Sequence, residues 1–133
     1  MLALGQHADD FAESFLMSAF HNGRLRTMKA HYLNGAGDVR IIRPFVYVRE
    51  RQTREFAEKN GLPVITENCP ACFEGPKERY RIKSLIAQQE HLHKELIPKL
   101  LSAMKPIMID SSFEAISGKK GPVPLGSKED DDE

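Results

Sequence analysis

This sequence of 133 residues lacks several features that would assign it to a specialised class of protein. It has only two cysteines, and no apolar run approaches the roughly 20 residues needed to span a bilayer. No basic segment followed by an apolar one marks an export signal. These absences argue against a disulfide-rich secreted scaffold and against a membrane protein, and they favour the cytoplasm or an organelle matrix.

The chain also lacks an excess of charge of either sign. Its formal net charge is +0, so no overall field attracts it to nucleic acid or to an anionic membrane. The charge is unevenly spread, because residues 128–133 carry five acids and the preceding body is therefore net basic. The net basic body is compatible with an RNA partner. We expect one domain over residues 1–110, with a modest core, and a disordered acidic tail over residues 111–133.

Strand patterns alternate with helical ones, which predicts an α/β fold with a largely parallel sheet. Residues 1–5 are typical of a short buried strand ended by Gly5. Further strands are expected at residues 39–43, before Pro44, and at 62–65. Residues 24–33 suggest an exposed basic strand or loop, and residues 34–38 a turn.

Three helical segments are expected. The first runs from about Asp10, with Glu13 at capping-box spacing, to the Asn22-Gly23 stop. The second covers about residues 50–60, with Phe56 and Ala57 facing inward. The third follows Pro76 and has a kink, or a junction between two helices, near residues 94–98. Its expected apolar stripe consists of Tyr80, Ile82, Leu85, Ile86, Leu92, Leu96, Leu100 and Met104.

Polar residues follow the first strand, where a helix should begin. His7, Asp9 and Asp10 stand at this junction, the type of position where open α/β sheets bind ligands. One interpretation is structural, since acids commonly cap helix starts. The other is functional, because these side chains could meet a nucleotide, its Mg²⁺ or an RNA base, and Mg²⁺ takes one or two protein carboxylates.

The two cysteines form one Cys-x-x-Cys motif, Cys69-Pro70-Ala71-Cys72. Thiolates at this spacing can bind one zinc ion or one face of an iron–sulfur cluster, although either site needs further ligands. His91 and His93 are candidate supplements. A thioredoxin-like redox pair is less favoured, because the next helix begins several residues beyond Cys72. Two ordinary loop cysteines are the remaining alternative.

A basic segment follows the cysteine loop. Its four cations are either the solvated face of a helix or a surface that contacts RNA phosphates. These residues are Lys77, Arg79, Arg81 and Lys83. Arg24, Arg26, Lys29 and Arg43 could extend the same surface if the fold brought them together.

Taken together, three motifs occur in order and at suitable spacing. They are Leu2-Ala3-Leu4-Gly5-Gln6-His7-Ala8-Asp9-Asp10, then Ile42-Arg43-Pro44-Phe45, then Cys69-Pro70-Ala71-Cys72 before a basic helix. This combination resembles the carboxyl-terminal half of the tRNA 2-thiocytidine synthetases, a family of the PP-loop (N-type ATP pyrophosphatase) superfamily. The resemblance covers about residues 1–108.

The resemblance implies a Rossmann-like, adenine nucleotide alpha hydrolase-like parallel sheet with flanking helices. It also implies adenylation of a tRNA cytidine followed by sulfur transfer to C2, with ATP, Mg²⁺ and a [4Fe–4S] cluster. On this basis Asp9 and Asp10 would be catalytic, and Cys69 and Cys72 would be cluster ligands. Gly5, His7 and Arg43 would bind the nucleotide or the substrate, and the basic helix would contact tRNA.

The family's phosphate-binding Ser-Gly-Gly-x-Asp-Ser loop is absent from the sequence. We therefore expect a fold truncated at its N-terminus that is inactive alone and works with a missing N-terminal half or a second subunit. The alternative is a non-catalytic module that binds RNA or a partner, with zinc on Cys69 and Cys72. An exposed apolar edge at Leu2 and Leu4 would favour homo-oligomers.

Overall fold

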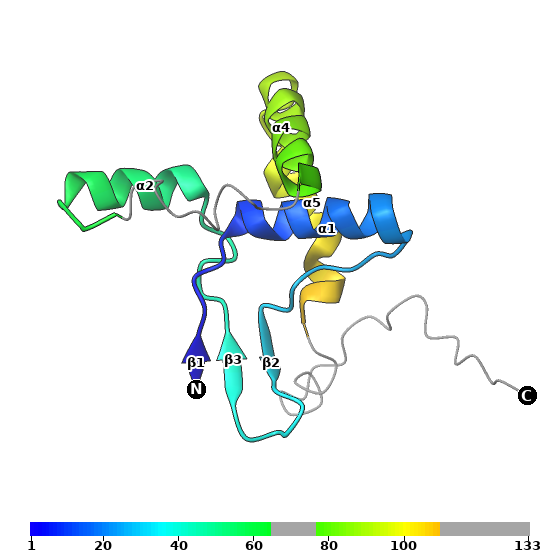
Figure 1. Cartoon of the computed structure of the whole chain (residues 1–133), viewed down its shortest axis with the longest axis vertical. Helices are drawn as coiled ribbons and strands as arrows, with labels where there is room; N and C mark the ends of the chain where they lie inside the picture. Colours follow the sequence, from blue (N-terminus) through cyan, green and yellow to red (C-terminus); the bar gives the residue numbers. More distant parts are fainter. Residues whose placement is uncertain (65–76, 110–133) are drawn as a thin grey trace, which may run out of the picture.

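The structure, a computed structural model, describes residues 1–64 and 77–109. Figure 1 shows the elements in space. In chain order they are β1 (Leu2–Ala3), α1 (Ala8–Asn22), β2 (His31–Leu33), β3 (Arg40–Ile42), α2 (Glu50–Lys59), α4 (Lys77–Leu92) and α5 (Leu96–Met108). Within these ranges no helix is both long and apolar enough to cross a membrane. The expected cysteine loop and acidic tail lie outside the described residues.

The sheet is mixed, which corrects the expectation of a largely parallel one. Its strand order is β1-β3-β2, with β1 parallel and β2 antiparallel to β3. The antiparallel pair follows from the short turn over residues 34–38, because parallel neighbours need a crossover of a dozen residues or more. The predicted turn is confirmed, and Asn34 Oδ1 accepts the backbone N–H groups of Asp38 and Val39 at 3.1 and 3.2 Å.

Two of the predicted strands differ from the structure, in which the residues concerned are exposed. The first strand covers only Leu2–Ala3 and both residues are exposed, whereas a buried strand was expected over residues 1–5. Residues 62–64 form no strand, and Leu62 and Val64 are exposed. Strands of two or three residues bury little area, so this sheet does not supply the main core.

The core lies between helices. Helix α1 packs against α4 and α5 and lies across one end of the sheet (Figure 1). Its buried apolar residues are Ala8, Phe11 and Ala12, which meet Ile82 and Ile86 of α4 and Ile97, Leu101, Met104 and Met108 of α5. Val46, in the loop before α2, completes this group. The packing of these three helices therefore fixes the position of the start of α1 and of the residues next to it.

Two helices present different faces from those expected. No residue of α2 is buried, and Phe56, expected to face inward, is exposed. On α4 the buried residues are Ile82 and Ile86, one turn apart, so Tyr80 lies on the opposite side. Tyr80 and Leu92 are exposed, which removes both from the predicted apolar stripe.

The expected junction near residues 94–98 is confirmed as a break between two helices. Helix α4 ends at Leu92 and α5 begins at Leu96. Pro98 stands in the first turn of α5, where the N–H that proline lacks would have no partner inside the helix. The break allows both helices to pack against α1.

Candidate functional site

The candidate site is built around the start of α1. His7, with an extended backbone, is the residue that caps this helix, and Asp10 stands at the third helical position. Asp10 Oδ2 accepts the backbone N–H of His7 at 3.0 Å. This corrects the expected cap, which paired Asp10 with Glu13. Ala8 N–H donates to the carbonyl of Val48 at 2.8 Å, so the helix start is tied to the segment before α2.

Asp9 is held by the beginning of α2. Arg49 donates from Nη2 to Asp9 Oδ1 at 2.9 Å, and the backbone N–H of Glu50 donates to Asp9 Oδ2 at 2.8 Å. Arg49 also donates from Nη2 to Glu90 Oε2 on α4 at 2.9 Å. One guanidinium thus bridges the start of α1, the start of α2 and the last turns of α4.

These contacts shift two pKa values. Burial by itself raises the pKa of the Asp9 carboxyl, but the hydrogen bonds from Arg49 and Glu50 outweigh it, and the net pKa falls below the usual 3.8. The hydrogen bond to Glu90, followed by those to Asp9, raises the pKa of Arg49 despite its burial. Both groups are therefore charged at neutral pH.

The lowered pKa of Asp9 predicts a pH effect on stability. The ionised carboxylate is favoured in the folded state, so its contribution is complete above the usual pKa of 3.8 and is lost as the pH falls through the lower folded value. Asp9→Asn removes this contribution. In urea titrations between pH 6 and pH 2, the difference in unfolding free energy between wild type and Asp9→Asn should shrink as the pH decreases. A difference independent of pH would contradict the assignment.

A second ion-pair group joins α1 to α4. Arg79 donates from Nε to Glu13 at 3.0 Å and from Nη2 to Asp10 at 3.2 Å. Glu13 is only 5% exposed, so the paired guanidinium offsets the cost of burying its charge. Arg79 was predicted to contact tRNA. Its observed partners are the two carboxylates.

The other predicted tRNA contacts lie along the same helix. Lys83 Nζ donates to Glu50 Oε2 at 3.0 Å, which raises the pKa of Lys83 although burial opposes the shift. Arg81 pairs with Glu78 at 2.7 Å within α4. Lys77 is exposed in the first turn of α4. Three of the four cations are thus neutralised locally.

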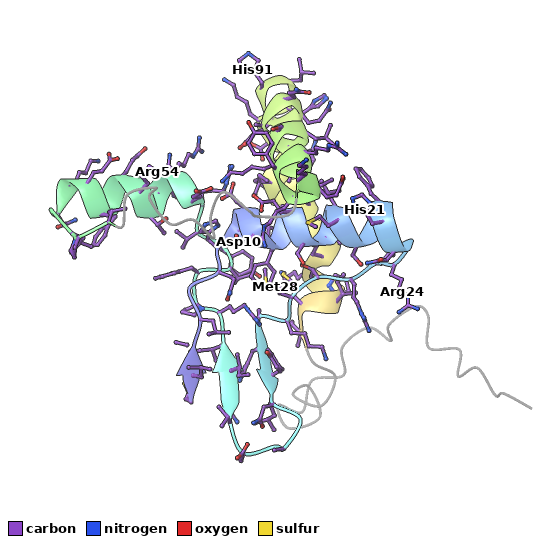
Figure 2. The ribbon with its side chains drawn as sticks, in the orientation of Figure 1. Asp10, His21, Arg24, Met28, Arg54 and His91 are labelled. Carbon is purple, nitrogen blue, oxygen red and sulfur yellow. The ribbon has the colours of Figure 1, made fainter. Side chains whose placement is uncertain are left out.

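A shallow hollow of about 210 Å³ opens beside this group. It brings together four of the predicted site residues with three that were not predicted to belong to a site. The lining residues are His7, Asp10, Glu13, Glu50, Arg79, Tyr80 and Lys83. In Figure 2, the labelled Asp10 shows where this hollow lies, at the end of α1 that faces α2. A larger hollow of about 440 Å³ lies towards His21 and Met28, near the other end of α1, and shares only Arg79 with the first.

Gly5 and Arg43 lie outside the hollow's lining. Arg43 Nε donates to Gln6 Oε1 at 3.0 Å, and its guanidinium lies 5.5 Å from the centroid of the Tyr32 ring. Arg43 therefore holds the loop after β1 against β3 and β2. A Cβ added at Gly5 would meet no atom within 4 Å, and its φ is not positive, so this position does not require glycine sterically.

Comparison with known proteins identifies the relatives of this chain. It is 39% identical over 103 residues to the tRNA-cytidine(32) 2-sulfurtransferase of Geobacter sulfurreducens, covering 77% of this chain and 40% of the relative. The enzyme of the same name from Syntrophotalea carbinolica is 38% identical over 117 residues, which are 45% of its length. The one from Pelobacter propionicus is 33% identical over 119 residues, which are 44% of its length. The chain is related to one part of these sulfurtransferases.

The chain spans less than half the length of these sulfurtransferases, which agrees with the predicted resemblance to one half of the family's polypeptide. No family model matches the sequence. No solved structure matches it either. The Rossmann-like ATP pyrophosphatase fold implied by the resemblance therefore stays a prediction, and the described residues show a small α/β arrangement.

The sulfurtransferase resemblance also predicted metal ligands. Cys69 and Cys72 lie outside the described residues. Within residues 1–64 and 77–109, no group of three or more His, Cys, Asp or Glu side chains is placed to hold a metal ion. The carboxylate of Asp9 accepts guanidinium and amide N–H groups instead, so this position does not fit Mg²⁺ as arranged here.

Sequence reasoning missed Arg49, Glu90 and Tyr80. Arg49 contacts Asp9 and Glu90, which lie 40 and 41 residues away in the sequence. No local sequence pattern indicates a contact at such separations. Tyr80 was assigned to the core because its spacing matched the apolar stripe. Glu50 could have been predicted to lie at a helix start, because the helix dipole favours an acid in the first turn of a helix.

Proposed function

We propose that this chain is one part of an ATP-dependent enzyme that thiolates a cytidine of tRNA. The relatives' names specify sulfur transfer to cytidine 32 of tRNA, and this shared ancestry carries the proposal. Because the match covers only 40–45% of these relatives, we infer that the phosphate-binding Ser-Gly-Gly-x-Asp-Ser loop is supplied by polypeptide outside these 133 residues. The cytoplasm or an organelle matrix, where tRNA is found, is the expected location.

The reaction proceeds in two steps in this proposal. The O2 atom of the cytosine attacks the α-phosphorus of ATP and displaces pyrophosphate. Sulfide-level sulfur (an HS⁻ equivalent) from a donor then attacks C2 and loses its proton, and AMP leaves with the original oxygen. Since His7 and Asp10 line the hollow, we propose that they contact the reacting nucleotide. Asp9 would hold the start of α1 in place through its bonds to Arg49 and Glu50.

We further propose Cys69 and Cys72 as two ligands of a [4Fe–4S] cluster, with the remaining ligands supplied from outside the chain, whose sequence has no other cysteine. A cluster of this kind is ordinarily held by thiolates, and the Cys-x-x-Cys spacing lets two of them bind one cluster face. The cluster would serve the sulfur-transfer step. Zinc on the same cysteines, in a module that only binds RNA, is the alternative.

A segment exchange tests this function. In the Geobacter sulfurreducens enzyme, the matched segment is replaced by this chain, and 2-thiocytidine in tRNA is measured by mass spectrometry. We expect the chimera to form 2-thiocytidine and the 133-residue chain alone to form none. Asp10→Asn in the chimera should lower the rate at least about tenfold, the equivalent of 1.4 kcal/mol of transition-state stabilisation.

The matched control for Asp10→Asn is Glu55→Gln on the exposed α2, which should leave the rate unchanged. A well-folded chimera that forms no 2-thiocytidine would contradict the proposed function. An Asp10→Asn chimera with the wild-type rate would remove only Asp10 from the reaction.

A further inference from the structure

Tyr80 is a large aromatic side chain that the core does not use. It precedes the buried Ile82 by two residues, and because helical residues are about 100° apart, its side chain points roughly 200° away from the buried face. Tyr80 is 74% exposed. Single exposed apolar residues are ordinary on protein surfaces, so the surroundings of Tyr80 decide whether it has a role.

Those surroundings are polar, and they contain more carboxylates than cations. Tyr80 lines the 210 Å³ hollow together with Asp10 and Arg79. The cations that line it are paired, Arg79 with Asp10 and Glu13, and Lys83 with Glu50. A paired cation attracts a phosphate weakly. The hollow is therefore better suited to an uncharged aromatic group than to the nucleic-acid backbone.

The lining of the hollow also offers hydrogen-bond acceptors. The carboxylate of Asp10 accepts N–H groups from the backbone of His7 and the guanidinium of Arg79, and His7 Nδ1 lies 3.2 Å from its Oδ2. An ionised carboxylate has about four acceptor positions, so it can accept more. The exocyclic amino group of cytosine is a donor that carboxylates recognise. An aromatic ring next to a carboxylate is thus matched to a cytosine base.

We propose that Tyr80 is a base-stacking residue that holds an unpaired cytosine of the RNA substrate over the hollow, with Asp10 accepting the cytosine amino group. This inference rests on the proposed function, which makes tRNA the substrate. Unstacked RNA bases are commonly held on exposed aromatic rings. The ring of Tyr80 provides that platform, and the cytosine would lie beside the residues assigned to the chemistry.

The test measures binding of the 133-residue chain to an unmodified tRNA transcript with cytidine at position 32. Tyr80→Ala should weaken binding about 5- to 150-fold, the range reported for removing one base–aromatic stack. Tyr80→Phe keeps the ring and should bind like wild type. Phe56→Ala, which removes an aromatic of comparable exposure (63%, against 74% for Tyr80) from α2, is the matched control and should have no effect.

Two further measurements separate stacking from a structural role. Tyr80→Ala should leave the melting temperature and the slope of log affinity against log salt unchanged, because Tyr80 is exposed and neutralises no phosphate. The sequence has no tryptophan, so Tyr80→Trp introduces a single one. Its fluorescence should be quenched by the cytidine-32 transcript, and more weakly by a transcript with uridine at that position.

Unchanged affinity of Tyr80→Ala for the transcript would overturn the inference, as would unquenched Tyr80→Trp fluorescence under conditions where the RNA is bound. Failure of the wild-type chain to bind the transcript would also overturn it. The proposed function is judged separately by 2-thiocytidine formation in the chimera, so the two can fail independently.

Discussion

Replacing Phe11 with alanine is expected to lower the free energy of unfolding by about 4 kcal/mol. Phe11 is fully buried on α1, among the residues of α4 and α5 that form the core. Its removal loses the transfer free energy of the ring and leaves a cavity that three packed helices fill only partly. Urea denaturation followed by circular dichroism at 222 nm measures the change.

Phe20→Ala provides the matched control for Phe11→Ala. Phe20 lies on the same helix but is 58% exposed, so the same substitution should change the free energy of unfolding by less than about 0.5 kcal/mol. The carbonyl of Phe11 also accepts the Thr27 hydroxyl at 3.1 Å, and this contact does not depend on the phenylalanine side chain. Similar losses for the two variants would show that α1 does not form the core as described.

Replacing Arg49 with methionine is expected to cost about 3 kcal/mol of unfolding free energy. Arg49 is 16% exposed and bridges Asp9 and Glu90, whose side chains are 17% and 25% exposed. Methionine keeps much of the apolar stem but leaves two partly buried carboxylates without their shared cation. The loss should be greatest near neutral pH, where the Asp9 carboxyl, whose pKa lies below its usual value, is charged. Urea denaturation at pH 7 measures it.

Arg54→Met is the matched control for Arg49→Met, because Arg54 forms a single exposed ion pair with Glu50 within α2. Its cost should be at most about 0.5 kcal/mol. Adding Asp9→Asn and Glu90→Gln to Arg49→Met should recover part of the lost stability, since the unpaired charges are then gone. Equal costs for Arg49→Met and Arg54→Met would contradict the bridging role.

Part of the candidate site could be predicted from sequence, and the limits follow from distance along the chain. His7, Asp9 and Asp10 were identified because a strand-like segment, a glycine and a helix start are adjacent in sequence. Arg79 and Lys83 were identified as cations, but their acidic partners were not. Arg79 meets Asp10 and Glu13 from 69 and 66 residues away. Such pairs depend on how helices pack.

The sequence by itself determined the local features and the ancestry. The end of α1 at Gly23, the turn over residues 34–38 and the break between α4 and α5 follow from capping, turn and proline preferences that act within a few residues. The motifs in their order predicted the resemblance to the tRNA sulfurtransferases, and the comparison confirms it.

Only the tertiary structure decided which faces are buried and which charges meet. It placed the core between three helices, left Leu2 and Tyr80 exposed, and paired the residues of β1 with those of β3 across 38 intervening residues. It also made Asp9 the partner of Arg49. The physical reason is that apolar periodicity shows that a helix has a buried face. The packing of the whole chain then decides which neighbours cover that face.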